Sequence, residues 1–213
     1  EVHPYLMRPK DSQPVLVRDF LLRIPGVSVL DLDTQKHRLQ DAIGTIWRGG
    51  AANDALNALL FSTTLTIRQV DILRLYSRYL RQANFSYGQI FIARALGAHP
   101  ALAAALVQYF EARFDPKTKD REITMEERKQ AILSGLEQVD NLAEDRVIRR
   151  FLELMEATLR TNVYQRSPLE GEPESGTRSG GGFKSTLSIK LRSALVPELP
   201  LPRPWAEIFV YSM

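Results

Sequence analysis

TIRQVDILRLYSRYLRQ, residues 66–82, is the stretch that decides the fold. Thr66 followed three residues later by Gln69 is the pattern of a capping box, in which each side chain satisfies a backbone N–H of the other residue at a helix start. Apolar side chains recur at helical spacing on two flanks, at Val70, Leu73, Tyr76 and Leu80 and at Ile72, Leu75 and Tyr79. The pattern predicts a long helix that is buried on most sides.

On the N-terminal side, helical patterns extend back to Asp33. Asp33 or Thr34 is expected to cap a helix that ends at Gly49-Gly50. Its predicted inward stripe comprises Leu39, Ala42, Ile43, Ile46 and Trp47. A short helix over about residues 52–60 is expected to precede the central one.

On the C-terminal side, four more helices are predicted before about residue 160. Two further capping boxes, Ser86 with Gln89 and Thr124 with Glu127, are expected to open two of them. Pro100 suits the first turn of the helix between them, which should end at Asp115-Pro116. The last helix is expected over residues 144–160, with Val147, Phe151, Leu154 and Leu159 inward.

Strand patterns occupy both ends of the chain. Val15–Ile24 and Val27–Leu30, separated by Pro25-Gly26, predict a hairpin. Thr186–Arg192 alternates apolar and polar residues, which predicts a half-buried strand able to pair with Val15–Ile24. Ile208–Tyr211 is apolar throughout, as in a strand that is buried on both faces.

These patterns predict a mainly α fold, a multi-helix domain flanked by a few β-strands at its N- and C-terminal ends. The expected organisation is an extended or β segment over 1–33, a helical domain over 34–165, a flexible Gly/Ser/Pro-rich loop over 166–185 and strands over 186–213. The chain starts at Glu1 rather than Met and stops within a strand pattern at Met213. We therefore expect it to be a segment of a longer protein.

Composition narrows the class of protein. The 28 basic and 25 acidic residues leave a net charge of only +3, too small a surplus to indicate a nucleic-acid partner. The absence of Cys excludes disulfides and thiolate metal sites and suits a reducing compartment. No apolar run approaches the roughly 18 residues of a membrane span. We expect a soluble cytoplasmic protein with no membrane partner.

No catalytic, cofactor-binding or metal-binding residue can be assigned from the sequence. His3, His37 and His99 are far apart and lack neighbours at metal-ligand spacing, and His99 before Pro100 suits a helix start. The sequence holds neither a P-loop nor a GxGxxG motif. The glycine run at 180–182 is followed by a strand pattern, whereas a phosphate site needs a helix there.

Two groups of arginines are candidate binding surfaces. Arg74, Arg78 and Arg81 fall on one face of the central helix, and Arg146, Arg149 and Arg150 cluster on the last helix. With Tyr76 and Tyr79 as stacking groups, they would suit nucleic acid or an acidic partner. The small net charge favours the simpler interpretation of a solvated face, or of pairing with carboxylates of a neighbouring domain. Glu137, Asp140, Glu144 and Asp145 form an acidic patch that suits a helix start.

Three stretches resemble the large bacterial NAD-specific glutamate dehydrogenases. The first runs from Ile67 to Gln82 and the second from Leu106 to Pro116. The third joins Ala157–Asn162 to Ile189–Leu191 and Pro202–Ser212. In order and spacing they cover most of the chain from about Trp47 onward. Met213 departs from the family, in which Pro usually follows Tyr-Ser, and the glycine-rich loop is longer than the family suggests.

The resemblance implies that this chain is the helical region just before the catalytic domain, with strands leading into that domain. The full-length enzyme would oxidise L-glutamate to 2-oxoglutarate and ammonia with NAD bound outside this segment. The resemblance implies that its partners are the catalytic and regulatory domains of the same chain, within a homo-oligomer. The alternative is an independent helical module that uses its arginine faces for nucleic acid or an acidic protein.

Overall fold

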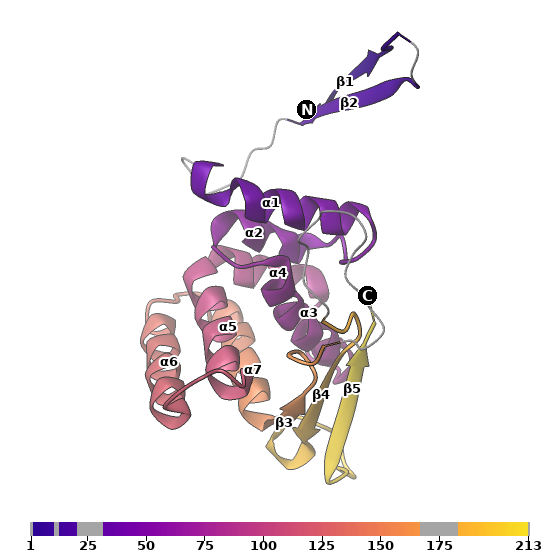
Figure 1. The fold of residues 1–213 in the computed structure, drawn as a ribbon. Helices are drawn as coiled ribbons and strands as arrows, with labels where there is room; N and C mark the ends of the chain where they lie inside the picture. The colour runs from indigo at the N-terminus through magenta and orange to yellow at the C-terminus, as the bar shows by residue number, and fades with distance from the viewer. Residues whose placement is uncertain (1, 11–12, 21–31, 167–182, 213) are drawn as a thin grey trace.

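The computed structural model describes residues 2–10, 13–20, 32–166 and 183–212 (Figure 1). The fold is mainly α, with a few strands at the two ends, as the sequence predicts. The elements in chain order are β1 (Val2–Met7), β2 (Val15–Phe20), α1 (Leu32–Trp47), the 3-10 helix η1 (Ala55–Ala58), α2 (Leu59–Ser62), α3 (Ile67–Gln82), α4 (Gln89–Ala98), α5 (Pro100–Phe114), α6 (Arg121–Leu136), α7 (Leu142–Ala157), β3 (Thr158–Thr161), β4 (Leu187–Arg192), the 3-10 helix η2 (Ser193–Leu195) and β5 (Ala206–Tyr211).

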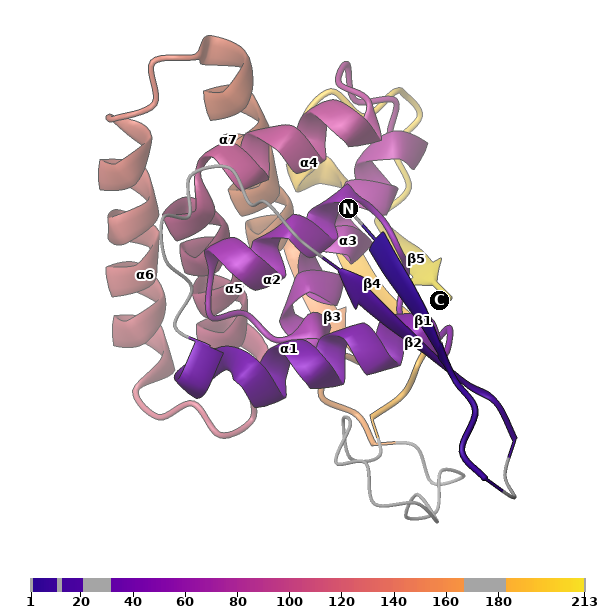
Figure 2. The same ribbon diagram turned by 90° about the horizontal axis from the view of Figure 1, so that it is seen from above.

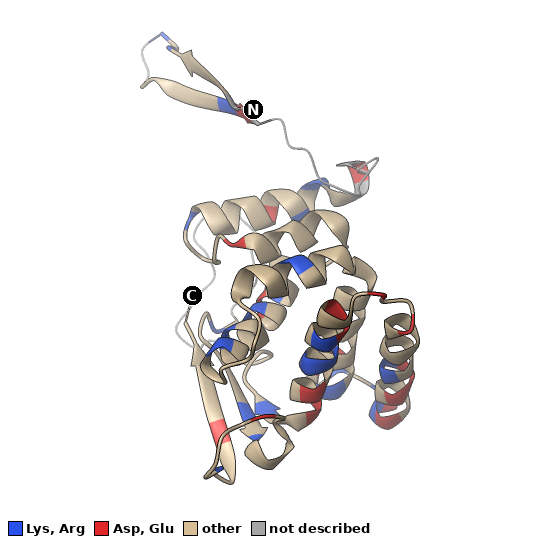
Figure 3. Ribbon diagram, turned by 180° about the vertical axis from the view of Figure 1, so that it is seen from behind, with Lys and Arg blue, Asp and Glu red and all other residues tan. Residues whose placement is uncertain are grey.

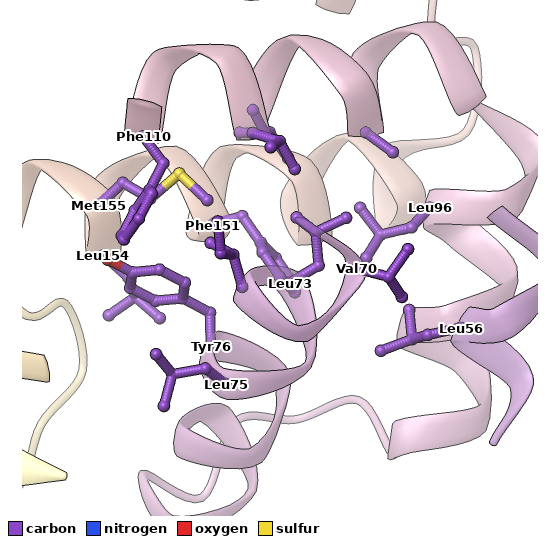
Figure 4. Packing of buried hydrophobic residues seen from close by; sticks show 14 of the residues in the cluster. Leu56, Val70, Leu73, Leu75, Tyr76, Leu96, Phe110, Phe151, Leu154 and Met155 are labelled. Atoms are coloured by element: carbon purple, nitrogen blue, oxygen red, sulfur yellow. The ribbon is translucent and has the colours of Figure 1, made fainter. Parts of the chain in front are cut away.

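Helix α3 is the centre of the hydrophobic core. The capping box is formed as predicted, because Thr66 accepts from the Gln69 backbone and Gln69 accepts from the Thr66 backbone. Every residue from Val70 to Ser77 is buried. Figure 4 shows α3 side chains packed against Leu96 of α4, Phe110 of α5 and Phe151 of α7, with Leu56 of η1 nearby. Helix α6 and the sheet of β3, β4 and β5 lie on opposite sides of the helices that surround α3 (Figure 2).

Helix α1 begins one residue earlier than the predicted caps. It starts at Leu32, so Asp33 lies in its first turn and neither Asp33 nor Thr34 is the N-cap. The predicted inward stripe is only half buried, because Leu39 and Ala42 are buried whereas Trp47 is 77% exposed. The helix ends before Gly49, whose φ of +75° is the left-handed conformation expected of a helix C-terminus.

The capping box predicted at Ser86 is wrong. Helix α4 begins at Gln89, its N-cap is Gly88, and that cap makes no side-chain hydrogen bond. The Gln89 side chain instead crosses to α3, where it donates to the Ser77 carbonyl at 2.7 Å and accepts from the Ser77 hydroxyl at 2.9 Å. A tertiary contact has replaced the local one.

The capping box predicted at Thr124 is also wrong, whereas the prediction for Pro100 is confirmed. Helix α6 begins at Arg121, and the Thr124 hydroxyl lies inside it, donating to the Asp120 carbonyl at 3.2 Å. Pro100 is the first residue of α5, which ends at Phe114 before Asp115.

The last helix is shorter at its C-terminus than predicted. Helix α7 ends at Ala157, and residues 158–161 form strand β3. Strand β3 pairs antiparallel with β4, and β4 pairs antiparallel with β5. Strand β4 has the predicted alternation, with Leu187, Ile189 and Leu191 buried. Its predicted pairing with Val15–Ile24 is wrong.

Strand β5 is an edge strand of this three-stranded sheet rather than a strand buried on both faces. Ile208 and Val210 are 69% and 57% exposed, whereas Phe209 points to the core and packs edge-on against Tyr79 with ring centroids 5.6 Å apart. Only one face of β5 is therefore covered by the described part of the chain.

The N-terminal strands form a separate two-stranded hairpin, drawn at the top of Figure 1. Strand β2 pairs with β1, a partner that the sequence analysis did not identify. The predicted partner, Val27–Leu30, lies outside the described residues, as does most of the predicted loop, residues 167–182. An antiparallel bridge joins Arg166 to Phe183 at the two ends of that loop.

Candidate functional site

Arg74 lies at the centre of the most enclosed charged group in the described residues. Its side chain is 0% exposed, and all three guanidinium nitrogens have partners. Nε donates to Asp54 at 2.8 Å, one terminal nitrogen donates to Asp54 at 3.0 Å and to Asn57 at 2.8 Å, and the other pairs with Asp71. We call Asp54, Asn57, Asp71 and Arg74 the Arg74 cluster.

Local structure places each member of this cluster. Asp54 is the N-cap of η1 and accepts from the Leu56 backbone at 3.1 Å. Asn57 lies within η1 and donates to the Ala52 carbonyl at 3.0 Å. Asp71 precedes Arg74 by one turn of α3, so the two side chains share a face. Arg74 therefore joins η1 to the buried face of α3.

Burial and neighbouring charges shift the pKa values of Asp71 and Arg74 in opposite directions. Burial raises the pKa of Asp71 to about 6, although the Arg74 and Arg68 charges act in the opposite direction. Burial alone would lower the pKa of Arg74, but its bonds to Asp54 and the charge of Asp71 raise it overall. Because each guanidinium nitrogen is already bonded to the protein, the cluster is built to hold η1 on α3 rather than to receive a ligand.

The predicted basic face of α3 is broken by this burial. Arg78 reaches Asp54 at 3.5 Å, Arg81 is exposed, and Arg74 is inside the core. Tyr76 and Tyr79 are 0% and 1% exposed, so neither ring is available to stack on a base. The carboxylates that pair with Arg74 and Arg78 in the described residues are Asp54 and Asp71. Nothing here supports the nucleic-acid alternative.

The arginines of α7 are paired at or near the surface. Arg146 bonds Glu198 at 2.5 Å, Arg149 bonds Asp145 at 2.8 Å, and Arg150 lies 3.3 Å from Glu198. Glu198, which has a left-handed backbone with φ +60°, thus links the β4–β5 connection to α7. Figure 3 shows acidic and basic residues interspersed on the helices rather than a face of one sign.

Three side chains of α3 make polar contacts with the C-terminal strand region. The Tyr79 hydroxyl donates to Glu207 of β5 at 2.8 Å, and the Tyr76 hydroxyl bonds the Thr158 hydroxyl of β3 at 2.8 Å. Arg68 donates to the Val163 carbonyl at 2.8 Å and also to the Lys184 carbonyl. Sequence analysis missed all three, although a tyrosine on a buried helix needs a polar partner for its hydroxyl and was the available signal.

The remaining candidate residues do not assemble into a site. The three histidines lie in β1, in α1 and at the N-cap of α5, where His99 Nε2 is 2.8 Å from Glu144. Two members of the acidic patch, Glu144 and Asp145, occupy the first turn of α7 behind the Asn141 cap, as a helix-start preference predicts. Across the described residues, no three His, Cys, Asp or Glu side chains are grouped to hold a metal ion.

Helices α4 and α5 are both rich in apolar residues. Among the described helices none is by itself long and apolar enough to cross a membrane. Taken together α4 and α5 have the length and composition, and the chain bends by 100° between them.

Two family models match successive parts of the chain. The model described as "Glutamate dehydrogenase, helical motif 3" matches residues 51–116. The model described as "Bacterial NAD-glutamate dehydrogenase, catalytic domain" matches residues 131–213. The chain belongs to the bacterial NAD-specific glutamate dehydrogenase family.

Relatives that match nearly all of this chain agree with the family assignment. Proteins named NAD-specific glutamate dehydrogenase from Halomonas elongata and Pseudomonas aeruginosa are 38% and 39% identical over 98% of the chain. The one from Mycobacterium tuberculosis is 36% identical over 100% of it. The chain spans only 12% to 13% of the length of these relatives.

The three contacts from α3 to the strands cross between the two matched regions. Tyr79, Tyr76 and Arg68 belong to the helical-motif match, while Thr158 and Glu207 belong to the catalytic-domain match. That second match begins within α6, well before the strand segment expected over 186–213. The two matched regions share one hydrophobic core in this structure.

Proposed function

We propose that the full-length protein is an NAD-dependent glutamate dehydrogenase that oxidises L-glutamate to 2-oxoglutarate and ammonia. Hydride passes from the substrate α-carbon to NAD, and water hydrolyses the resulting imine. The proposal is supported by relatives named NAD-specific glutamate dehydrogenase, which match at least 98% of the chain. NAD is proposed to bind outside these 213 residues, and no residue of this segment is proposed to be catalytic.

The role proposed for this segment is a non-catalytic scaffold that holds the first strands of the catalytic domain. The observation that carries it is the continuous core from α3 to β4, into which Tyr76, Phe151 and Ile189 are all fully buried. Because buried side chains from both matched regions interlock, the strands cannot move far from α3 without exposing apolar surface. The proposed organisation is an N-terminal extended or β segment over 1–33 and a helical domain over 34–165. A loop over 166–185 and the C-terminal strands over 186–213 follow.

We further propose that the segment joins preceding regulatory modules to the catalytic domain of the same chain, in a cytoplasmic homo-oligomer without nucleic-acid or membrane partners. Family membership and the much greater length of the relatives support further domains in the same polypeptide. The low net charge of +3 supports the exclusion of nucleic acid.

The test is NADH formation from glutamate by the full-length protein and by residues 1–213 separately. We expect turnover by the former with NAD and none by the latter. Turnover by residues 1–213 alone would contradict the scaffold role, and an inactive, folded full-length protein would contradict the dehydrogenase assignment.

The scaffold role has a sharper test in the full-length enzyme. Tyr79→Phe removes only the hydroxyl that donates to Glu207. We expect a lower melting temperature with unchanged KM for glutamate and NAD, because the residue supports the strand without contacting substrate. Tyr87→Phe, on a partly buried ring outside this contact, is the matched control.

A further inference from the structure

The N-terminal hairpin is apolar on both of its faces. Cross-strand partners point to the same face of a sheet, and the register pairs Tyr5 with Val17, Met7 with Val15 and Leu6 with Leu16. The first two pairs therefore share one face, and the third lies on the other. Six of these side chains are 40% to 56% exposed: Tyr5, Leu6, Met7, Val15, Leu16 and Val17.

Such a hairpin is not a self-sufficient unit. An isolated two-stranded ribbon is at best marginally stable in water, and strands with apolar residues on both faces are typical of sheets that are covered on both sides. The described core, in contrast, begins at Leu39 and includes no hairpin residue. The apolar area of the hairpin must therefore be covered elsewhere, because exposed strands of this kind drive association.

The two edges of the hairpin differ in their capacity to pair. Pro4 lies in the middle of β1 and has no N–H to donate, which is typical of an edge that is left unpaired. Strand β2, residues Val15–Phe20, contains no proline and offers an uninterrupted backbone. The open edge for another strand is therefore that of β2.

We propose that the hairpin completes a larger sheet formed by another part of the same polypeptide, joined along the edge of β2 and covered on both faces. This inference rests on the proposal that the chain is a segment of a longer enzyme. The Mycobacterium tuberculosis relative matches 100% of the 213 residues, including the hairpin. These residues span only 13% of that relative's length. Covalent linkage gives such a sheet a high effective concentration, which favours it over a second copy of the chain.

The test uses cysteine labelling in the full-length protein, since the 213 residues contain no Cys. Val17→Cys and Leu16→Cys report on the two faces, and Gln13→Cys, exposed and outside the strands, is the matched control. Alkylation at each site is followed by mass spectrometry of the peptide that carries it. We expect Val17→Cys and Leu16→Cys to react at least about tenfold more slowly than Gln13→Cys, at every protein concentration.

Each other outcome overturns part of the proposal. Equal rates at all three sites would mean that the hairpin is not covered, and protection of one face alone would exclude a two-sided sheet. Protection that disappears on dilution would assign the hairpin to a second copy. Glutamate-dependent NAD reduction is measured on the same samples, so an uncovered hairpin in an active enzyme contradicts this inference and leaves the proposed function intact.

Hydrogen exchange of the unsubstituted full-length protein tests the edge without any variant. If β2 pairs on both sides, amides throughout Val15–Phe20 should be protected, whereas alternate amides of β1 should exchange freely. Free exchange at alternate positions of both strands would contradict the assignment of the β2 edge.

Discussion

Helices α3 and α7 carry arginine groups that look alike in sequence and differ in structure. Arg74 of α3 is fully enclosed and bonded to Asp54, Asn57 and Asp71, whereas Arg149 of α7 is 47% exposed and bonds Asp145 of its own helix. Arg150, 8% exposed, lies between these extremes. Burial, not spacing along the helix, decides how much an arginine contributes to the free energy of unfolding. Water screens exposed ion pairs, whereas a buried charge that loses its partner is costly.

The largest effect expected from this comparison is that of Arg74→Met in residues 1–213. The change leaves the buried Asp71 carboxylate without its partner, so we expect a loss of about 3–5 kcal/mol in the free energy of unfolding. Urea denaturation followed by circular dichroism measures it. Arg78→Met, at a 28% exposed side chain that reaches Asp54 at 3.5 Å, is the control and should cost about 1 kcal/mol or less.

The double variant Arg74→Met with Asp71→Leu sharpens the same point. Removing both buried charges eliminates the unpaired carboxylate, and apolar replacements of similar volume are often neutral. We expect most of the lost stability to return. A double variant as unstable as Arg74→Met would show that the guanidinium is needed for its bonds to η1 rather than as the partner of Asp71.

The second effect is a pH dependence that belongs to Asp71. Its pKa is about 6 in the folded chain against 3.8 without burial, so the folded state holds the extra proton between these values. Stability from this group is therefore present below about pH 4 and is lost as pH rises to 6, by up to about 3 kcal/mol. Asp71→Asn should remove this component, seen as a difference between the two stability–pH curves. Parallel curves from pH 4 to 6 would contradict the assignment.

The third effect concerns Arg150, the intermediate case. Its guanidinium donates to the Pro197 carbonyl at 2.8 Å and lies over the Phe85 ring at 5.1 Å. Arg150→Met keeps the stem and removes the charged hydrogen bond, so we expect a loss of about 1.5–3 kcal/mol. Hydrogen exchange should increase chiefly at residues 193–199. An equal increase throughout α7 would indicate that Arg150 supports the helix instead of the β4–β5 connection.

Most of the helical fold could be predicted because its signals are local. The Thr66 box, Pro100 and the Gly49 stop act over three or four residues, and α3 carries its burial pattern on two flanks. Two of the failures arise where a distant partner decides the outcome. Gln89 bonds Ser77 rather than the Ser86 region, and Thr158 leaves the helix to bond Tyr76.

The charged contacts were harder to predict from the sequence for the same reason. The sequence analysis grouped Arg74 with Arg78 and Arg81 and did not identify Asp71 as its partner, and only the fold brings Asp54 to Arg74 from 20 residues away. Likewise, four apolar residues from Ile208 to Tyr211 suggested burial on two faces, whereas the described chain covers only the face that Phe209 shares with Tyr79. Substitutions to increase polarity on β5 belong at Ile208 and Val210, not at Phe209.

The smallest effect expected is that of Arg149→Ala. An exposed Asp–Arg pair one turn apart in a helix contributes about 0.3–0.5 kcal/mol, and alanine recovers part of this through its helix propensity. We expect a change within about 0.5 kcal/mol that vanishes in about 1 M salt, where exposed charges are screened within about 3 Å. Arg74→Met should lose nearly the same stability at both salt concentrations because the Arg74 side chain is 0% exposed and its pair with Asp71 is buried. If Arg149→Ala were as destabilising as Arg74→Met, exposure would not be the property that separates the two helices.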